Sequence, residues 1–271
     1  MMPGDALCLD TRGDSETYPL LSSELTPLLI SDHREGAIMR RRWNLPALKE
    51  HIRTSEPDRK WLLSTVDSVY QSLCIYEYHK SLAREAFAAY HAKHDPDGIK
   101  MFAAAMMAGT DEELEEFAVA KIASEANLIA AINITRNTFD IFAQIVNALA
   151  LPQPLQIEDC TISKVRDVLP EGTLRTEITR VTKLHWFRYL AGFSNTIKHR
   201  QLISHKPSQK YEEGTGEYLG GGAEVAAFKH HSRKFKSYWV QEVLEGTVEM
   251  HNEIVSLGIT LNEHCLTPAL P

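Results

Sequence analysis

The chain has 271 residues, of which 44% are hydrophobic and 24% are charged, a composition typical of globular proteins and not of disordered ones. A chain of this length can bury a large core without disulfides or a metal, and it suits one domain with irregular arms. Its net charge of -7 excludes a generally basic surface, so any attraction to nucleic acid has to come from a local basic patch.

Cysteine spacing, hydropathy and the absence of known motifs indicate where the protein is located and which cofactors it lacks. No two cysteines have C-x-x-C spacing, so a zinc knuckle or redox motif is not indicated and free thiols are expected. No basic N-terminal region precedes an apolar run, and no stretch reaches the roughly eighteen apolar residues of a membrane span. No phosphate-loop or dinucleotide-binding motif is present. We therefore expect a cytoplasmic protein with no membrane association, no metal and no cofactor.

The first part of the chain predicts an arm followed by a helix. Residues 1–50 show no sustained period and are punctuated by prolines, which indicates an irregular N-terminal arm with at most one short helix. From Ser55, a candidate helix cap with Pro57 in the first turn, apolar residues recur at three- and four-residue spacing. This pattern predicts a helix as far as about His94.

The second predicted helix has a clear start. Thr110 and Glu113 form a capping box, and the acidic first turn suits the positive end of the helix dipole. The helix is expected to continue to about Leu149, just before Pro152. Its second half is apolar over so wide a surface that it should be central to a bundle.

Two further helices and a loop complete the expected architecture. A third helix is predicted over about 174–203 and a fourth over about 228–257, ended by Gly258. Between them, the polar glycine-rich stretch 207–222 indicates a mobile loop with at most a short hairpin. The fold class is therefore all-α. We expect a bundle of four to five long helices over 51–260, with a C-terminal tail over 261–271.

The third helix carries a polar face opposite its apolar one. At about 100° of rotation per residue, Trp186, Leu190, Phe193 and Ile197 share the core side. The opposite side holds Val181, His185, Arg188, Gly192, Asn195 and His199. Such a row can grip a phosphate or position a 2′-hydroxyl, with Arg188 as fixed charge, Asn195 as orienter and His199 as acid or base. The alternative is the solvated side of an amphipathic helix.

The second helix has a stripe consisting mostly of amides. The residues at spacings of four and three are Asn133, Asn137, Asp140, Gln144 and Asn147, with Arg136 beside them. Amides are favoured where polar groups need defined hydrogen bonds, so the stripe can line a cleft or a subunit interface. A weakly charged surface is the alternative.

Basic side chains gather on both sides of the expected loop. They are Lys198, His199, Arg200, His205, Lys206 and Lys210, then Lys229, His230, His231, Arg233, Lys234 and Lys236. Aromatic residues, among them Phe235 and Tyr238, are interleaved with the second group. A local cluster of positive charge in a protein of net negative charge points to a phosphate-bearing partner. The alternative is ordinary charge at helix ends.

These features resemble a known family. A long helix with polar residues over 125–147, followed by a helix that ends in Asn195-Thr196-Ile197-Lys198-His199-Arg200, is similar to the HEPN superfamily, in particular a bacterial branch with an N-x-x-K-H-R ending. The resemblance implies a helical bundle, a homodimer, and a metal-independent ribonuclease of a toxin or defence system.

The motif of that superfamily is an arginine, a polar residue, three residues and a histidine. Asn195 and His199 match it, whereas Ser194 holds the position of the arginine. Arg188 is the candidate substitute, because it shares the face of His199.

Three functions therefore remain open. The first is an RNA- or nucleotide-binding protein, with or without cleavage, using His199, Asn195 and Arg188, with Lys198, Arg200, His185, Arg136 and Asp140 as further binding residues. The second is a non-catalytic module that binds a partner protein or a second copy. The third, least supported by motifs, is a small-molecule enzyme using the amide stripe.

Overall fold

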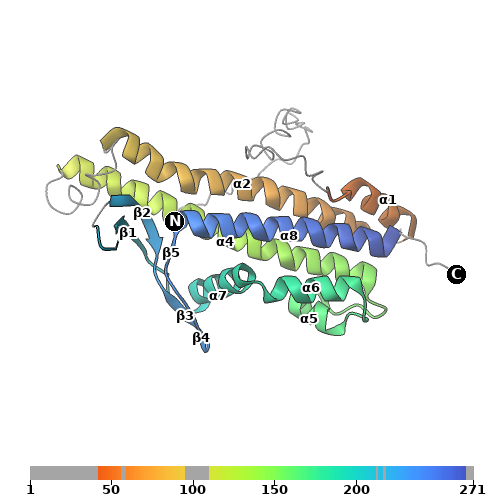
Figure 1. Ribbon diagram of the computed structural model, residues 1–271. Helices are drawn as coiled ribbons and strands as arrows, with labels where there is room; N and C mark the ends of the chain where they lie inside the picture. Colours follow the sequence, from red (N-terminus) through yellow and green to blue (C-terminus); the bar gives the residue numbers. More distant parts are fainter. Residues whose placement is uncertain (1–41, 56–58, 95–109, 212, 216–217, 267–271) are drawn as a thin grey trace, which may run out of the picture. The chain divides into compact units, whose positions relative to one another are not determined.

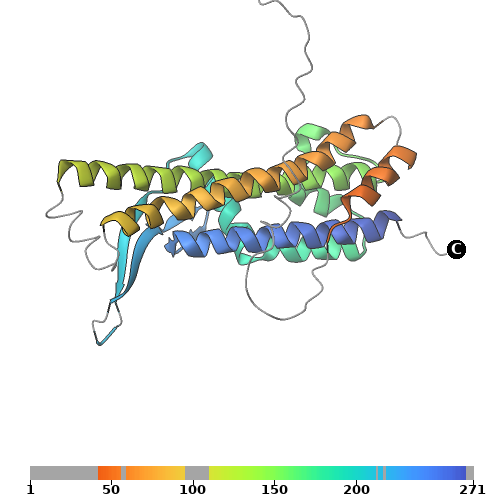
Figure 2. The same ribbon diagram turned by 90° about the horizontal axis from the view of Figure 1, so that it is seen from above.

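A computed structural model describes residues 42–55, 59–94, 110–211, 213–215 and 218–266. The chain divides into two units, residues 1–40 and 41–271, and every described element belongs to the second. Three long helices form the centre of this unit: α2 (Lys60–His94), α4 (Asp111–Ala150) and α8 (Val240–Leu266). They run side by side in both ribbon views, and α4 packs against both α2 and α8 (Figures 1 and 2). The predicted mainly helical fold is therefore confirmed.

The capping box at the start of α4 is present as predicted. The Thr110 hydroxyl accepts a hydrogen bond from the Glu113 backbone N–H, and the Glu113 carboxylate accepts one from the Thr110 N–H. These two bonds satisfy donors that the first helical turn leaves without partners. The helix ends at Ala150, one residue later than expected.

The N-terminal boundary differs from the prediction. A short helix, α1 (Leu45–Ser55), overlaps the end of the expected arm and continues beyond residue 50, and Ser55 ends it instead of capping α2. The Asn44 side chain accepts a hydrogen bond from the Ala47 N–H, which starts α1 in spite of Pro46. Residues 1–41, and Pro57 within 56–58, lie outside the described residues.

The single third helix of the prediction is two helices. A short 3-10 turn, η2 (Ile157–Asp159), and helix α5 (Ile162–Val168) precede α6 (Thr173–Lys183) and α7 (His185–His199). Leu184, with φ -59° and ψ 149°, has an extended backbone that separates α6 from α7. No glycine or proline marks this break in the sequence. Because of this break, the helical rotation of α7 cannot be extended back into α6. Val181, which was predicted on the polar face, is instead a buried core residue of α6.

The prediction of a mobile loop over 207–222 is wrong, because the described residues of this stretch form β-strands. Strands β1 (His205–Tyr211), β2 (Tyr218–Val225) and β5 (Tyr238–Trp239) form an antiparallel sheet in the order β1-β2-β5. Strands β3 (Phe228–His230) and β4 (Arg233–Phe235) form a hairpin. Gly222 of β2 lies beside the Trp239 ring, and a Cβ atom there would be 3.7 Å from the ring, an ordinary contact distance.

The last helix consequently starts and ends later than predicted. It begins at Val240 and not near residue 228, and it runs through Gly258 to Leu266. Gly258 is needed for packing, because a Cβ atom there would overlap the ring of Trp43. The Trp43 indole N–H also donates to the Asn262 side chain at 3.1 Å. The expected tail is thus helical over 261–266, and 267–271 lie outside the described residues.

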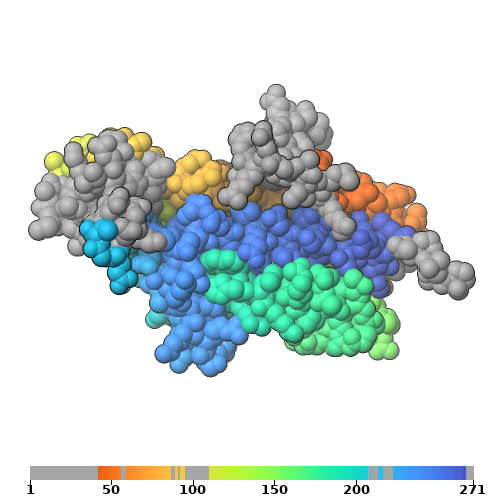
Figure 3. All heavy atoms as spheres, in the orientation of Figure 1, coloured from red at the N-terminus to blue at the C-terminus, as the bar shows by residue number. Residues whose placement is uncertain are grey.

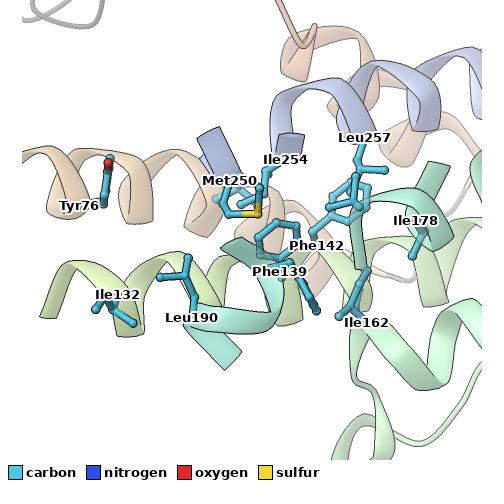
Figure 4. Packing of buried hydrophobic residues seen from close by; sticks show 14 of the residues in the cluster. Tyr76, Ile132, Phe139, Phe142, Ile162, Ile178, Leu190, Met250, Ile254 and Leu257 are labelled. Carbon is cyan, nitrogen blue, oxygen red and sulfur yellow. The ribbon is translucent and has the colours of Figure 1, made fainter. Parts of the chain in front are cut away.

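Buried apolar side chains from most of the helices form one core. Figure 4 shows members from α2, α4, α5, α6, α7 and α8 converging between the helices, including Tyr76, Phe139, Phe142, Ile162, Ile178, Leu190, Met250 and Leu257. A polar group is enclosed there as well. The His251 imidazole Nε2 lies 3.0 Å from the Thr135 hydroxyl and its ring packs on Tyr76, with 3.9 Å between ring centroids. Burial lowers the pKa of His251 to about 3, and Lys80 adds to this shift.

The expectation that no stretch suits a membrane span needs correction, because helix α4 has the length and composition of a membrane-spanning helix. One 18-residue window reaches a mean hydropathy of 1.4, and 22% of that window is buried. Core helices of soluble proteins can have the same composition, and α4 packs against α2, α5, α7 and α8. The location in the cytoplasm stays a prediction. Among the described cysteines, Cys74, Cys160 and Cys265 are free thiols.

Candidate phosphate-binding site

A basic pocket lies between the junction of α6 with α7 and the segment β4–β5. Its volume is about 520 Å³, and it is lined by Lys183, His185, Arg188, Arg233, Lys234, Phe235, Lys236 and Tyr238. In the space-filling view, the α6–α7 segment (green) and the β3–β5 segment (blue) meet on this face (Figure 3). Five of these side chains carry a permanent positive charge, and none is a carboxylate.

Local structure brings these charges together from two distant parts of the chain. The extended backbone of Leu184 places Lys183 at the end of α6 and His185 at the start of α7. Across the pocket, β4 exposes Arg233 and Lys234 and buries Phe235. Strand β4 ends at Phe235 and β5 begins at Tyr238, and these two residues contact α7 at Gly192 and at His185.

The hairpin β3–β4 is held on α7 by close packing at a glycine. A Cβ atom at Gly192 would lie 2.8 Å from the Phe235 ring and 3.5 Å from the Cβ atom of His230. The rings of Phe228 and Phe235 stack with centroids 4.8 Å apart, and both contact Tyr189. Gly192 therefore does leave space above α7, but the hairpin fills this space, not a ligand.

The cations that line the pocket are not paired with carboxylates of the described residues. No ion pair between described residues involves Lys183, Arg188, Arg233, Lys234 or Lys236. On the same α6 helix, in contrast, Arg180 is paired with Glu177 and Glu253, and these carboxylates raise its pKa above the usual value. Like charges gathered without counter-ions repel one another, and a bound anion would relieve that repulsion.

One polar pair stands among the cations. His185 Nε2 lies 2.9 Å from the Tyr238 hydroxyl, within hydrogen-bonding distance. The Tyr238 ring packs on Trp186 with centroids 5.0 Å apart, and Lys236 Nζ lies 4.7 Å from its centre as a cation–π contact. Behind it, Tyr189 is fully buried without a hydrogen-bond partner for its hydroxyl among the described residues, and burial raises its pKa.

The residues predicted on the polar face of α7 fall into two groups. His185 and Arg188 line the pocket, whereas Asn195 and His199 are at the other end of α7 and are exposed. Arg188 and His199 are eleven residues apart, which is about 16 Å along a helix. At this separation, Arg188 and His199 of one chain are poorly placed to contact the same phosphate group. The hairpin packed on Gly192 also lies between them.

The basic surface nevertheless continues from the pocket toward His199. Arg233 is the cross-strand partner of His230. Burial, His231 and Arg200 lower the pKa of His230, so Arg200 at the end of α7 lies within electrostatic reach of the hairpin. Lys198 and Arg200 are exposed at this end of α7. We call this series, from the pocket through the hairpin to Arg200, the basic track.

Asp140 and Asn147 of the amide stripe of α4 have packing roles, whereas Asn137 is exposed. Arg136 and Asp140 form an ion pair of 2.8 Å, and the Arg136 guanidinium lies 5.8 Å from the centre of the Phe187 ring. Asn147 bonds both the backbone N–H and the C=O of Leu155. Between described residues, no hydrogen bond links Asp140 or Asn137 with Asn195 or His199. The stripe anchors α7 and the connection after α4.

Sequence reasoning missed one pocket residue and the shape of the other wall. Lys183 received no role, because the break at Leu184 has no sequence signal. Arg233, Lys234, Phe235, Lys236 and Tyr238 were recognised only as a basic and aromatic cluster. In the part of the chain that the structure describes, no three His, Cys, Asp or Glu side chains lie together as a metal site requires.

Comparison with known proteins gives no relative: no family model, no curated protein and no solved structure matches the chain.

Proposed function

We propose that this protein binds RNA through the phosphate groups, with the pocket as the centre of the interface and the basic track as its extension. The observation that carries this proposal is the convergence of five cations with no carboxylate in one pocket of a protein whose net charge is -7. Selective placement of positive charge in an acidic protein favours a phosphate-bearing ligand.

The length of the charged surface favours a polynucleotide over a mononucleotide. Arg200 follows α7, fifteen residues after His185, which is about 22 Å of helix. A single nucleotide would occupy the pocket alone and leave Lys198, Arg200 and His230 without a role. A flexible single strand can follow such a track, and Tyr238, a partly exposed aromatic side chain beside the cations, is typical of single-strand binding sites.

Cleavage is not included in this proposal, since Arg188 and His199 lie about 16 Å apart along α7. The relation to the HEPN superfamily, a homodimer and a cytoplasmic location stay predictions from the sequence. The alternative is a non-catalytic protein-interaction module. In that case a partner protein, and not RNA, would bind to the pocket and the basic track.

The test is a fluorescence-anisotropy titration of a labelled single-stranded RNA of about sixteen nucleotides. The variant is Arg233→Ala/Lys234→Ala, since both side chains are exposed and their loss leaves the core intact. Loss of two phosphate contacts should weaken binding by tenfold or more. It should also lower the slope of log affinity against log salt by about 2.

A matched control is Lys60→Ala, which removes an exposed lysine at the start of α2, beside α1. It should bind RNA like the unaltered protein. Equal affinity of the double variant and the control would overturn the proposal. Complete competition by ATP at equal phosphate concentration would assign the pocket to a nucleotide instead.

A further inference from the structure

The side chains that line the pocket offer many hydrogen-bond donors and few acceptors. The lysine and arginine side chains that line it only donate, and Phe235 has no polar side-chain atom. Among the lining side chains that the structure describes, His185 and Tyr238 alone can accept a hydrogen bond. A phosphate group only accepts from these cations, so it has no need of this pair.

The pair has capacity left after its own hydrogen bond. A phenol has one donor and two acceptor lone pairs, and an imidazole adds one further nitrogen. The contact of 2.9 Å between His185 Nε2 and the Tyr238 oxygen uses one donor and one acceptor. At least one acceptor position on the phenol oxygen remains for a ligand group that donates.

Tyr238 is held firmly in this place. It is the first residue of β5, where it pairs with Val225 of β2. Its ring contacts Tyr189 and His185 at centroid distances of 5.3 and 5.7 Å, in addition to Trp186 and Lys236. A hydroxyl fixed in this way loses little conformational entropy when it binds a ligand.

We propose that the Tyr238 hydroxyl, oriented by His185, accepts a hydrogen bond from a ribose 2′-hydroxyl, so that the pocket selects RNA over DNA. The 2′-hydroxyl is the donor that RNA carries beside each phosphate and that DNA lacks. A ligand without it leaves the phenol acceptor unpaired in the pocket. This inference rests on the proposed function, and it adds the identity of the preferred nucleic acid.

The experiment compares three labelled single strands of one sequence: RNA, DNA and fully 2′-O-methylated RNA. The methylated strand keeps the sugar geometry of RNA and loses the donor, so it separates shape from hydrogen bonding. One hydrogen bond of ordinary strength corresponds to roughly fivefold to tenfold in affinity. The unaltered protein should prefer RNA to both other strands by about that factor.

Two variants test whether the Tyr238 hydroxyl causes the preference for RNA. Tyr238→Phe keeps the ring and its aromatic contacts, and it should lower RNA affinity to the level of DNA while DNA affinity is unchanged. Arg233→Ala should weaken all three strands by the same factor, because it removes only a phosphate contact. Circular dichroism spectra matching the unaltered protein establish that both variants are folded.

The outcomes separate the two proposals. Binding of RNA and DNA with equal affinity by the unaltered protein, or a preference for RNA that persists in Tyr238→Phe, overturns the role of Tyr238 and leaves RNA binding intact. Equal affinity for RNA and its methylated form overturns it as well. Absence of binding to any strand overturns the proposed function itself.

Discussion

Ser194 donates a hydrogen bond of 2.7 Å to the side chain of Asn133, and this bond joins α7 to α4. Ser194 is only 6% exposed, so it faces the interior of the bundle. The amide stripe of α4 therefore meets α7 at Ser194, which lies outside the polar face predicted for α7, and no hydrogen bond between described residues joins the stripe to Asn195 or His199. The position that the HEPN motif gives to an arginine is inside the protein.

Restoring the motif arginine at this place is expected to damage the fold. Ser194→Arg would bury a guanidinium opposite an amide, and we expect it to lower the free energy of unfolding by roughly 3 kcal/mol or more. Ser194→Ala loses one hydrogen bond and should cost about 1 kcal/mol. Urea unfolding followed by circular dichroism measures both. Ser194→Arg with unchanged stability would contradict the buried position of residue 194.

The two ends of α7 should behave differently toward RNA. Arg188→Ala removes a pocket cation and should weaken RNA binding about fivefold, whereas His199→Ala should change it less than twofold. Incubation with total RNA in EDTA gives the second readout, and we expect no cleavage that depends on His199. Cleavage by the unaltered protein that His199→Ala abolishes would instead support the ribonuclease that the HEPN resemblance implies.

Two glycines of α8 should resist replacement although alanine is the better helix former. A Cβ atom at Gly258 would overlap the ring of Trp43, and one at Gly246 would overlap that of Trp186. We expect Gly258→Ala to lower the free energy of unfolding by roughly 1–3 kcal/mol. A double-mutant cycle with Trp43→Leu provides the control, because the smaller side chain makes room for the methyl group. An equal cost in both backgrounds would argue against this contact.

His251 should make the stability of the protein depend on pH. Its pKa is about 3 in the folded protein and near 6.5 when unfolded, so between these values only the unfolded chain binds the proton. The resulting stability is complete above pH 6.5 and is lost as the pH falls. Between pH 7.5 and 5, the unaltered protein should lose about 2 kcal/mol more than His251→Gln.

Urea unfolding at the two pH values measures this difference. Burial also lowers the pKa of His205, which lies 3.2 Å from Glu125, but this residue is present in both proteins and cancels in the comparison. An identical loss of stability in both proteins would show that His251 takes up its proton without unfolding.

The helical part of the fold was predictable because its signals are local. Helix α4 has a capping box at Thr110 and a proline soon after its end, and its wide apolar surface indicates a central position. The strands were not predictable in this way. Gly220, Gly221 and Gly222 have low strand propensity, and they lie in β2 because they pair with Lys210, Gln209 and Ser208 of β1.

The same reason limits the prediction of the site. His185 and Arg188 were recognised from a helical period, and Arg233 to Lys236 from their charge. Their meeting across one pocket depends on the break at Leu184 and on the fold of 228–239 into strands. Both are set by tertiary contacts, such as Phe235 on Gly192, that no local pattern encodes.

The two walls of the pocket come from residues 183–188 and 233–238, and the β1–β2 hairpin is synthesised between them. A nascent chain that ends before residue 233 carries Lys183, His185 and Arg188 without the opposing cations. If the pocket binds a polyanion as proposed, that affinity arises only after residues 233–238 have been made and have packed against α7. By mass action, a ligand bound there stabilises the docked hairpin and with it the completed chain.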